Sequence, residues 1–399
     1  MVSVSEIVRT AKRNLKARTF WAVSELLRIL VPKGVHKALL VLKIDAIGDL
    51  FVWFSSGIAD VAAYSRNHEG GAVILVRKEL AGFISELGLF AEVWPIDAVA
   101  FRSNLIYRVK LLHRLRCHGF SEVFQARIAR DFLTEDLITR TVGADIAQSP
   151  VGDHSNLTAW EAHIGDAWYR PILRFDGGPA HELARHRALT AAAFGRPAER
   201  FQLTTVRSRY SAGLRPDYFI VAPGAGWAQR RWPVENFIEL AQRLTQSRGL
   251  QCVVVGSGAD AADGERIKGR IGGDTLNLCG KLGLMDLAAL VERATVVIGN
   301  ESGPVHIAAY FKVTSVAILG GGHYGWFMPY PSGLPGVKPP RIASVELPCF
   351  GCNWICRYQI PKGNAVPCIQ QVPVELAWLE LSAALADENR ENPNQALGV

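Results

Sequence analysis

Short runs of apolar residues alternate with amphipathic stretches along most of the chain. Residues 38–44, 73–78 and 92–96 are nearly continuous apolar runs, the pattern of strands buried on both faces of a parallel sheet. After residue 217 a second series begins, in which YFIVA, CVVVG, TVVIG and TSVAIL each lead into a glycine-containing turn. Helical segments separate the runs, so the pattern predicts an α/β protein with two Rossmann-like halves in tandem, each a parallel sheet covered by helices.

Two segments flank or join these halves. Residues 4–31 have apolar positions at helical spacing with basic residues between them, and Pro32 ends the predicted helix. Residues 196–217 are polar and contain proline, as expected of a linker.

Length and composition agree with two domains. The chain has 399 residues, of which 49% are hydrophobic, enough for large cores and unlike a disordered chain. It contains neither an apolar run of about 20 residues that could span a membrane nor a signal-peptide pattern at its start. The expected location is therefore the cytoplasm.

The net charge of +7 is concentrated at one end. Residues 1–38 contain eight lysine and arginine residues against two glutamates, a net +6, so the rest is nearly neutral. A nucleic-acid-binding protein would carry its basic face on the main domain, and no nucleic acid is expected as a partner. The basic helix either lies on an anionic membrane surface, which the sequence slightly favours, or packs on the N-terminal domain as a solvated helix.

Two strand-to-helix turns in the second half have the features of an anion site. In VVIGNESGPVHIAAYF (296–311) a buried strand ends in a polar turn, and the following helix offers free backbone N–H groups to a phosphate. In YFIVAPGAGWAQRRWPVENF (218–237) the small residues Gly224, Ala225 and Gly226 precede Arg230, a cation that could hold the remaining charge. Each turn alone is equally compatible with an ordinary connection, but together they indicate a pyrophosphate site.

A third motif lies in the first half, in LKIDAIGDLFVW (42–53). Asp45 and Asp49 follow the first strand, at the edge where open α/β sheets bind ligands. Asp49 could act as a general base or simply cap the next helix, and this segment alone favours the cap.

Four segments together, IDAIGD, PGAGWAQRRWP, NLCGKLGLMDLAALVERA and GNESGPVHIAA, resemble glycosyltransferase family 9 in order and spacing. The best-known members of that family are ADP-heptose:lipopolysaccharide heptosyltransferases. The resemblance runs from about residue 38 to 385 and is strongest in the C-terminal half. It implies a GT-B fold, with two Rossmann-like domains facing a cleft, an inverting mechanism, and no catalytic metal or cofactor.

The resemblance also assigns roles to individual positions. Asp49 matches the family's proposed catalytic base, and Arg230 stands where most members have a phosphate-binding lysine. Ser302, Gly303 and His306 match the turn that holds the donor phosphates.

Two acidic residues complete the implied donor site. Glu301 stands where many members have an aspartate that contacts the donor sugar, so the side chain is one methylene longer here. Asp260 matches the acidic residue that binds the ribose.

The implied domain organisation has four parts. They are a basic amphipathic helix (1–37), an N-terminal acceptor-side domain (38–200), a C-terminal nucleotide-sugar-binding domain (201–348), and a cysteine cluster with a C-terminal helix (349–399).

The implied function is transfer of a sugar, heptose or a similar hexose, from an ADP-sugar to a hydroxyl of lipopolysaccharide core or another surface glycan. Two alternatives remain open: a protein acceptor, as in the branch that modifies autotransporters, and a nucleotide-sugar-binding protein without turnover. Retention of Asp49, Arg230 and His306 argues against the second alternative.

Seven cysteines are present. Cys117, Cys252 and Cys279 stand alone and are expected to be buried core thiols. Cys349, Cys352, Cys356 and Cys368 crowd within twenty residues, which favours a structural zinc or iron site over reduced, packed cysteines. Their spacing is not a standard zinc pattern.

Overall fold

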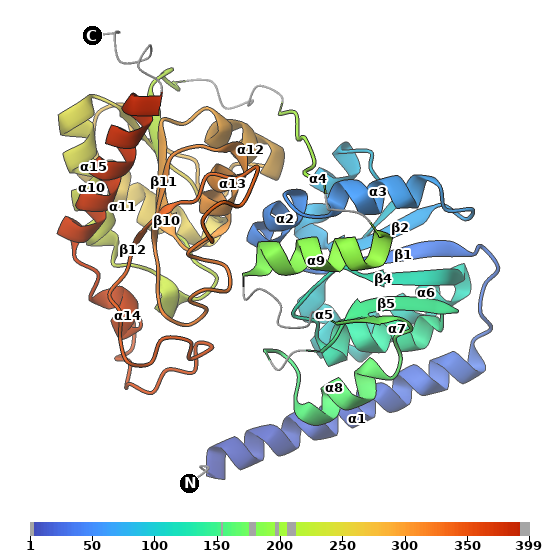
Figure 1. The fold of residues 1–399 in the computed structure, drawn as a ribbon. Helices are drawn as coiled ribbons and strands as arrows, with labels where there is room; N and C mark the ends of the chain where they lie inside the picture. The colour runs from blue at the N-terminus through green and yellow to red at the C-terminus, as the bar shows by residue number, and fades with distance from the viewer. Residues whose placement is uncertain (1–3, 153–154, 175–180, 196–198, 206–212, 392–399) are drawn as a thin grey trace. The chain divides into compact units, whose positions relative to one another are not determined.

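The computed structural model describes residues 4–152, 155–174, 181–195, 199–205 and 213–391, and it contains two compact units (Figure 1). Unit 1 comprises Met1–Ala46, Ser56–Pro179 and Ala184–Glu199. Unit 2 comprises Ile47–Ser55, Ala180–Leu183 and Arg200–Val399. Part of the polar segment 196–217 lies outside the described residues.

Unit 1 is built on a six-stranded parallel sheet in the order β3-β2-β1-β4-β5-β6. Its strands are β1 (Ala38–Lys43), β2 (Ala72–Arg77), β3 (Glu92–Ile96), β4 (Phe120–Gln125), β5 (Ile146–Pro150) and β6 (Ile172–Leu173). Its helices after β1 are α3 (Ile58–Arg66), α4 (Lys78–Glu86), α5 (Ala98–Ser103), α6 (Leu105–His118), the π-helical turn η1 (Phe132–Asp136), α7 (Leu137–Val142), α8 (Ala159–Asp166) and most of α9 (Glu182–Phe194). Every residue of β1 is buried, as its continuous apolar run predicted.

Unit 2 repeats the plan with a six-stranded parallel sheet in the order β12-β11-β10-β7-β8-β9. Its strands are β7 (Tyr218–Ala222), β8 (Gln251–Val254), β9 (Leu276–Asn277), β10 (Val296–Asn300), β11 (Ser315–Ile318) and β12 (Arg341–Ala343). Its helices are α2 (Ile47–Phe54), the 3₁₀ turns η2 (Ala228–Arg230) and η3 (Gly258–Asp260), α10 (Val234–Arg248), α11 (Ala261–Ile271), α12 (Leu284–Glu292), α13 (Gly303–Phe311), α14 (Pro367–Gln370) and α15 (Val374–Glu391).

The two sheets share one strand order, that of a Rossmann fold. In each, the first strand of the series lies at the centre, between the second and the fourth. The expectation of two Rossmann-like domains is therefore confirmed. The strand order reverses between β1 and β4 in unit 1 and between β7 and β10 in unit 2, and open α/β sheets bind ligands at the carboxyl edge of this point.

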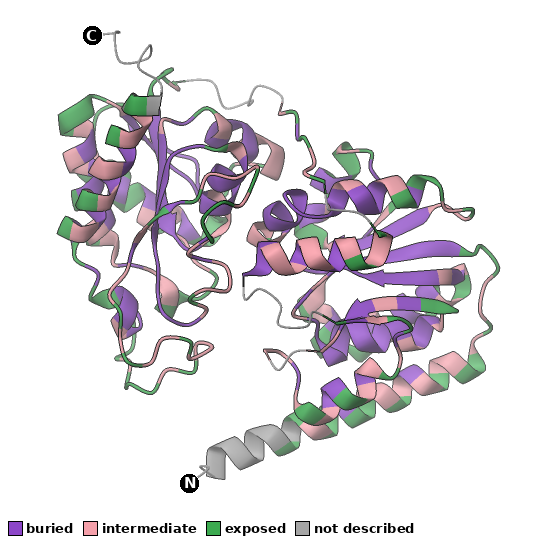
Figure 2. Cartoon of the chain, viewed as in Figure 1, coloured by how far each residue is buried: buried purple, intermediate pink, exposed green. Residues whose placement is uncertain are grey.

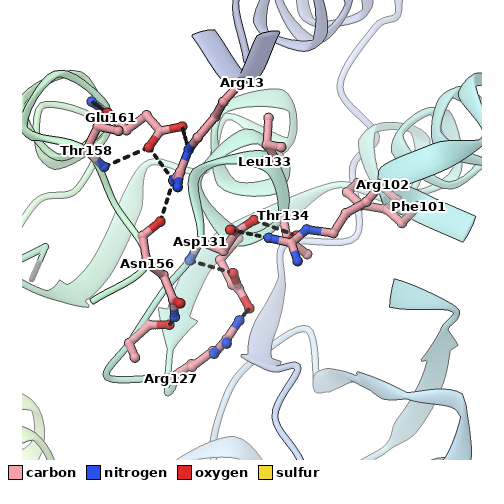
Figure 3. Close-up of polar contacts among 12 residues, drawn as sticks. Arg13, Phe101, Arg102, Arg127, Asp131, Leu133, Thr134, Asn156, Thr158 and Glu161 are labelled. Atoms are coloured by element: carbon pink, nitrogen blue, oxygen red, sulfur yellow. Dashed lines mark hydrogen bonds and ion pairs between the residues drawn. The ribbon is translucent and has the colours of Figure 1, made fainter. Parts of the chain in front are cut away.

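The N-terminal helix α1 (Val4–Leu30) packs on unit 1 along α7 and α8 (Figures 1 and 2). It buries Ala17 and Ser24, and Trp21 lies against Trp160 and Trp168 with ring centroids 6.0 and 5.8 Å away. Ion pairs fix it further, among them Arg13 with Glu161 of α8 (Figure 3) and Glu25 with Arg140 of α7. Packing of the helix on the N-terminal domain, one of the two interpretations of the sequence, is therefore observed.

Helix α2 differs from the expected domain division. The sequence analysis assigned residues 38–200 to one domain, and the chain does pass from unit 1 to unit 2 at Glu199–Arg200. However, Ile47–Ser55 belongs to unit 2, because the apolar face of α2 packs on α13. The Phe51 ring, for example, meets that of Tyr310 edge-on at 5.5 Å. The chain thus leaves unit 1 directly after its first strand.

None of the helices in the described part of the chain is long and apolar enough to cross a bilayer.

Candidate active site

The carboxyl ends of β7 and β10 are neighbours in unit 2, at the reversal of strand order. The side chain of Asn300, the last residue of β10, links the two loops that start there. Its Nδ2 donates to the carbonyl oxygen of Pro223 (2.7 Å), and its Oδ1 accepts from the backbone N–H of Trp232 (3.0 Å). The loop after β7 is therefore fixed at both ends, with the small residues 224–226 between them.

Arg230 extends from this loop toward the turn after β10. Its Nη2 lies 2.9 Å from Glu301 Oε2, and its guanidinium carbon lies 4.3 Å from the ring centroid of Trp354. The side chains of Arg230 and Glu301 are only 18% and 7% exposed. The structure thus pairs the predicted phosphate cation with the predicted sugar-binding carboxylate.

Burial raises the pKa of Glu301 to about 7, although the nearby Arg230 charge acts to lower it. The carboxylate of Asp49 raises this pKa further. Glu301 therefore changes its charge near neutral pH, and Asp49 on α2 lies close enough to interact with it.

The start of α2 packs closely against α13. Gly48 lies on the ring of His306, where an added Cβ would come within 2.8 Å of Cδ2. Gly303 faces Ile47, where a Cβ would come within 3.0 Å of the isoleucine Cγ2. The IGD and SGPVH motifs, about 250 residues apart, are thus adjacent, and the two glycines permit the close approach.

Ser302 is the N-cap residue of α13. Its hydroxyl is buried and has no hydrogen-bond partner among the described residues, and it does not cap the helix. Because the first N–H groups of a helix also lack intrahelical acceptors, the Ser302–Gly303 turn retains donors for an anion.

His306 is a neutral member of the site. It is 5% exposed, and burial lowers its pKa to about 3. Its Nδ1 lies 2.8 Å from the hydroxyl of Tyr330. His306 therefore positions neighbouring groups or offers a neutral hydrogen bond; it does not add positive charge to a phosphate site.

Asp260 and Arg231 form a separate, structural pair. The carboxylate of Asp260 accepts from the N–H and hydroxyl of Ser257, both at 2.7 Å, and its other oxygen lies 2.7 Å from Arg231. It also fills the space beside Gly224, where a Cβ would lie 2.7 Å away. Asp260 is 4% exposed, so its carboxylate is engaged in holding the turns after β7 and β8, and a direct ribose contact remains a prediction.

A chain of alternating charges occupies the equivalent edge of unit 1. Lys43 lies 2.5 Å from Asp45, which lies 2.7 Å from Arg127, which lies 3.0 Å from Glu135. Figure 3 shows Arg127 near a further ion pair, that of Arg102 with Asp131. Glu135 is deeply buried, and its pKa is raised by that burial.

The isolated cysteines agree only partly with expectation. Cys252 and Cys279 are buried, and burial raises the pKa of Cys279 to about 12. Cys117 is exposed, so its prediction as a core thiol was wrong: it lies near the end of α6, on the side away from the sheet core.

Three of the four clustered cysteines, Cys349, Cys352 and Cys356, lie in one loop of unit 2, and Cys368 lies in α14. Cys368 is buried and accepts from the N–H of Gly321 at 3.4 Å, and its pKa is raised by burial and by Cys349, Cys352 and Cys356. The thiols thus lie near one another. Yet among the described residues no three His, Cys, Asp or Glu side chains form a set that could hold a metal ion, so the structure does not support the predicted zinc or iron site.

Three residues of the site carried no signal in the sequence analysis: Asn300, Tyr330 and Trp354. Asn300 ends the same strand that precedes Glu301, and a polar residue at a buried strand end could have identified it. Tyr330 and Trp354 come from loops far along the chain, and only the folded structure brings them to α13 and Arg230.

The model of glycosyltransferase family 9 (heptosyltransferase) matches residues 173–333. Lipooligosaccharide heptosyltransferase 2 of Haemophilus influenzae is 32% identical over 103 residues, which is 25% of this chain and 30% of that protein. Lipopolysaccharide heptosyltransferase 3 of Escherichia coli K12 is 30% identical over 121 residues, 30% of this chain and 35% of that protein. The matched segments thus span about a third of the length of these relatives.

Solved structures resemble almost the whole fold. The E. coli ADP-heptose lipopolysaccharide heptosyltransferase II superimposes with a TM-score of 0.62 at 18% identity, covering 88% of this chain and 99% of that one. The iron-containing dodecameric glycosyltransferase TibC of enterotoxigenic E. coli gives a TM-score of 0.53 at 13% identity, covering 90% and 81%. At such identities the likeness shows a shared fold.

Proposed function

We propose that this chain is an inverting glycosyltransferase, and the match of residues 173–333 to the model of glycosyltransferase family 9 supports the proposal. It would transfer a sugar, heptose in the first instance, from an ADP-sugar to an acceptor hydroxyl. The observation that carries the proposal is the meeting of Arg230, Glu301 and the α13 N-terminus at the strand-order reversal of unit 2, with the Asp49 helix packed beside them.

Each group has a distinct task in this proposal. Asp49 takes the proton of the acceptor hydroxyl while the oxygen of that hydroxyl attacks the anomeric carbon of the donor sugar. The bond from that carbon to the diphosphate breaks, and the leaving group gains negative charge. Arg230 and the N–H groups at Ser302–Gly303 stabilise this charge, as fixed donors do most effectively when they are partly shielded from water.

Glu301 and His306 would shape the sugar side of the site. Arg230 holds one carboxylate oxygen of Glu301, and the remaining acceptor sites of the carboxylate can accept a hydrogen bond from a sugar hydroxyl. His306 stays neutral, which keeps an additional positive charge away from the anomeric carbon. Since Arg230 and backbone groups hold the phosphates in this arrangement, we expect added Mg²⁺ to change the rate little.

For the acceptor we propose a glycan of the lipopolysaccharide core or another surface glycan. The names of the relatives, lipooligosaccharide and lipopolysaccharide heptosyltransferases, support this choice. A protein acceptor, as in the branch of the family that modifies autotransporters, is the second candidate.

We further propose that α1 attaches the protein to an anionic membrane surface. Although its inner face packs on unit 1, the helix exposes Leu15 (69%), Leu26 (58%), Ile29 (68%) and Leu30 (68%) on its outer side, where Figure 2 shows exposed positions along the helix. Residues 1–38 also carry the net charge of +6. Apolar side chains that insert and basic side chains that attract anionic lipids are the two requirements of an interfacial helix.

The donor is tested by mass spectrometry of nucleotide sugars that co-purify with the protein, followed by calorimetric titration with ADP and UDP. We expect an ADP-sugar and a clear preference for ADP. Incubation of the purified protein and its donor with truncated lipopolysaccharide or with candidate proteins then separates the acceptors. Failure to bind any nucleoside diphosphate would refute the proposed transferase, and binding without transfer to any acceptor would favour a non-catalytic binding protein.

A further inference from the structure

The loop that contains Cys349, Cys352 and Cys356 packs directly on the chain after β11. At residues 320–322, three consecutive glycines leave room for the rings of Phe350 and Trp354: a Cβ on Gly321 would lie 2.0 Å from the Phe350 ring, and one on Gly322 would lie 2.2 Å from the Trp354 indole. The backbone N–H of Gly351 donates to Gly321 (2.7 Å). The loop is thus fixed to the carboxyl edge of the sheet, where the candidate active site lies.

The backbone of this loop is constrained where it presents Trp354. Asn353 and Trp354 have φ angles of 48° and 60°, the left-handed region that residues other than glycine rarely adopt. The Asn353 N–H donates to the Gly322 carbonyl (2.9 Å), and its side-chain oxygen lies 2.7 Å from His323 Nε2. Such strained conformations persist where surrounding contacts enforce them and often lie at functional sites.

The constrained loop places the indole of Trp354 against Arg230. The guanidinium carbon lies 4.3 Å from the ring centroid, within the range of a cation–π contact. The indole N–H is buried and has no hydrogen-bond partner among the described residues. Within the described residues, the ring is therefore held by packing and by its contact with Arg230, without a hydrogen bond from its indole N–H.

We propose that Trp354 is a positioning residue that holds Arg230 in the orientation required by the donor diphosphate. Glu301 binds one edge of the guanidinium while Trp354 covers its face, so the remaining N–H groups keep a fixed direction. This assignment rests on the proposed function for the identity of the ligand. It also explains why position 230 is an arginine where most family members have a lysine. A planar guanidinium can stack on a ring and form an ion pair at the same time, which the compact ammonium group of lysine does less well.

The test is a double-mutant cycle in the full-length protein. Trp354→Leu is made in the wild type and in Arg230→Lys, and ADP affinity is measured by calorimetry. A partly desolvated cation–π contact predicts about a tenfold loss in the wild-type background and much less in the Arg230→Lys background. Trp354→Phe, which keeps an aromatic face, should restore most of the affinity, and Ile355→Ala, next to Trp354 but 76% exposed, should change nothing.

A second measurement does not depend on the ligand. In protein labelled with ¹⁵N-arginine, the Nε–H signal that disappears in Arg230→Lys belongs to Arg230; it should exchange slowly in the wild type and rapidly in Trp354→Leu. Equal affinity losses in both backgrounds, or an unchanged exchange rate in Trp354→Leu, would overturn the assignment. A wild type that binds no ADP but shows the slow signal would support the positioning role and refute the proposed function alone.

Discussion

Asp49 and Glu301 lie close enough to influence each other electrostatically, yet their surroundings differ. Glu301 is 7% exposed on its side chain and paired with Arg230, whereas Asp49 lies in the more accessible first turn of α2. A catalytic base must reach the acceptor hydroxyl, so we propose the more accessible Asp49 as the base and the buried, arginine-bound Glu301 as the sugar ligand.

We expect Asp49→Asn to lower turnover by about a hundredfold or more, because the amide cannot accept the acceptor's proton. ADP affinity and melting temperature should stay close to wild type. Steady-state kinetics with calorimetry check this, and Asp274→Asn, on an exposed loop of the same unit, serves as control. Near-normal turnover would leave Asp49 as a structural residue at the start of α2.

Glu301→Gln should change how stability depends on pH. The folded-state pKa of about 7 lies above the ordinary value of 4.5, so folded protein retains a proton that unfolded protein releases. The wild type should therefore lose stability relative to the variant between pH 4.5 and 7, by on the order of 3 kcal/mol, with no further relative change above pH 7. Urea unfolding of both proteins across this range measures the difference; parallel curves would contradict the raised pKa.

Arg230 and Arg231 should respond differently to removal, because one faces Glu301 and the other the buried Asp260. Arg230→Ala should weaken ADP binding on the order of tenfold to a hundredfold, because that loss of affinity corresponds to the free energy of one or two charge-assisted hydrogen bonds. Arg231→Ala should instead lower the free energy of unfolding by about 1–3 kcal/mol, since it leaves a buried carboxylate poorly paired. Titration and thermal unfolding of both variants distinguish the roles; equal losses of ADP affinity would refute them.

Among the elements, the contact of α2 with α13 matters most for the site. Gly48→Ala places a methyl group 2.8 Å from the His306 ring and should separate the two helices. We expect the free energy of unfolding to fall by about 1–3 kcal/mol and turnover to fall by a larger fraction than the stability. Gly269→Ala is the matched control: it lies in α11 of the same unit, nothing lies within 4 Å of the added carbon, and it should be neutral or slightly stabilising. Equal effects of the two changes would show that the contact is loose.

At the scale of elements, the sequence predicted most of what was found. Buried parallel strands are continuous apolar runs, so β1, β7 and β10 were recognisable, and turn residues identified the loops at their carboxyl ends. The side chains that complete the site were not predictable. Trp354 reaches Arg230, and His306 packs against Gly48, only through contacts between residues more than a hundred positions apart in the chain.

For the whole molecule, the outer face of α1 makes the membrane proposal testable. Removing the helix is a poor test, because Ala17 and Trp21 pack on unit 1 and their loss would destabilise it. Replacing Leu15, Leu26, Ile29 and Leu30 with serine removes only exposed side chains.

The wild type should sediment with anionic vesicles at low salt and be released as salt rises, since each basic residue near the surface contributes about 1 kcal/mol of screened attraction. The four-serine variant should stay in the supernatant with an unchanged melting temperature. Leu379→Ser, equally exposed on α15 of unit 2, is the control and should sediment normally. Absence of wild-type sedimentation, or normal sedimentation of the variant, would leave α1 as a structural helix only.

The assignment of α2 to unit 2 has a consequence during synthesis. The ribosome makes this helix early, with Leu50, Phe51, Trp53 and Phe54 unprotected, but its partner α13 begins about 250 residues later. At translation rates of about 5–20 residues per second, α2 waits roughly 12–50 s for the surface that buries it. Unit 2 therefore cannot be completed from its own contiguous stretch of chain, and the apolar side chains of α2 need other contacts to shield them until α13 has emerged.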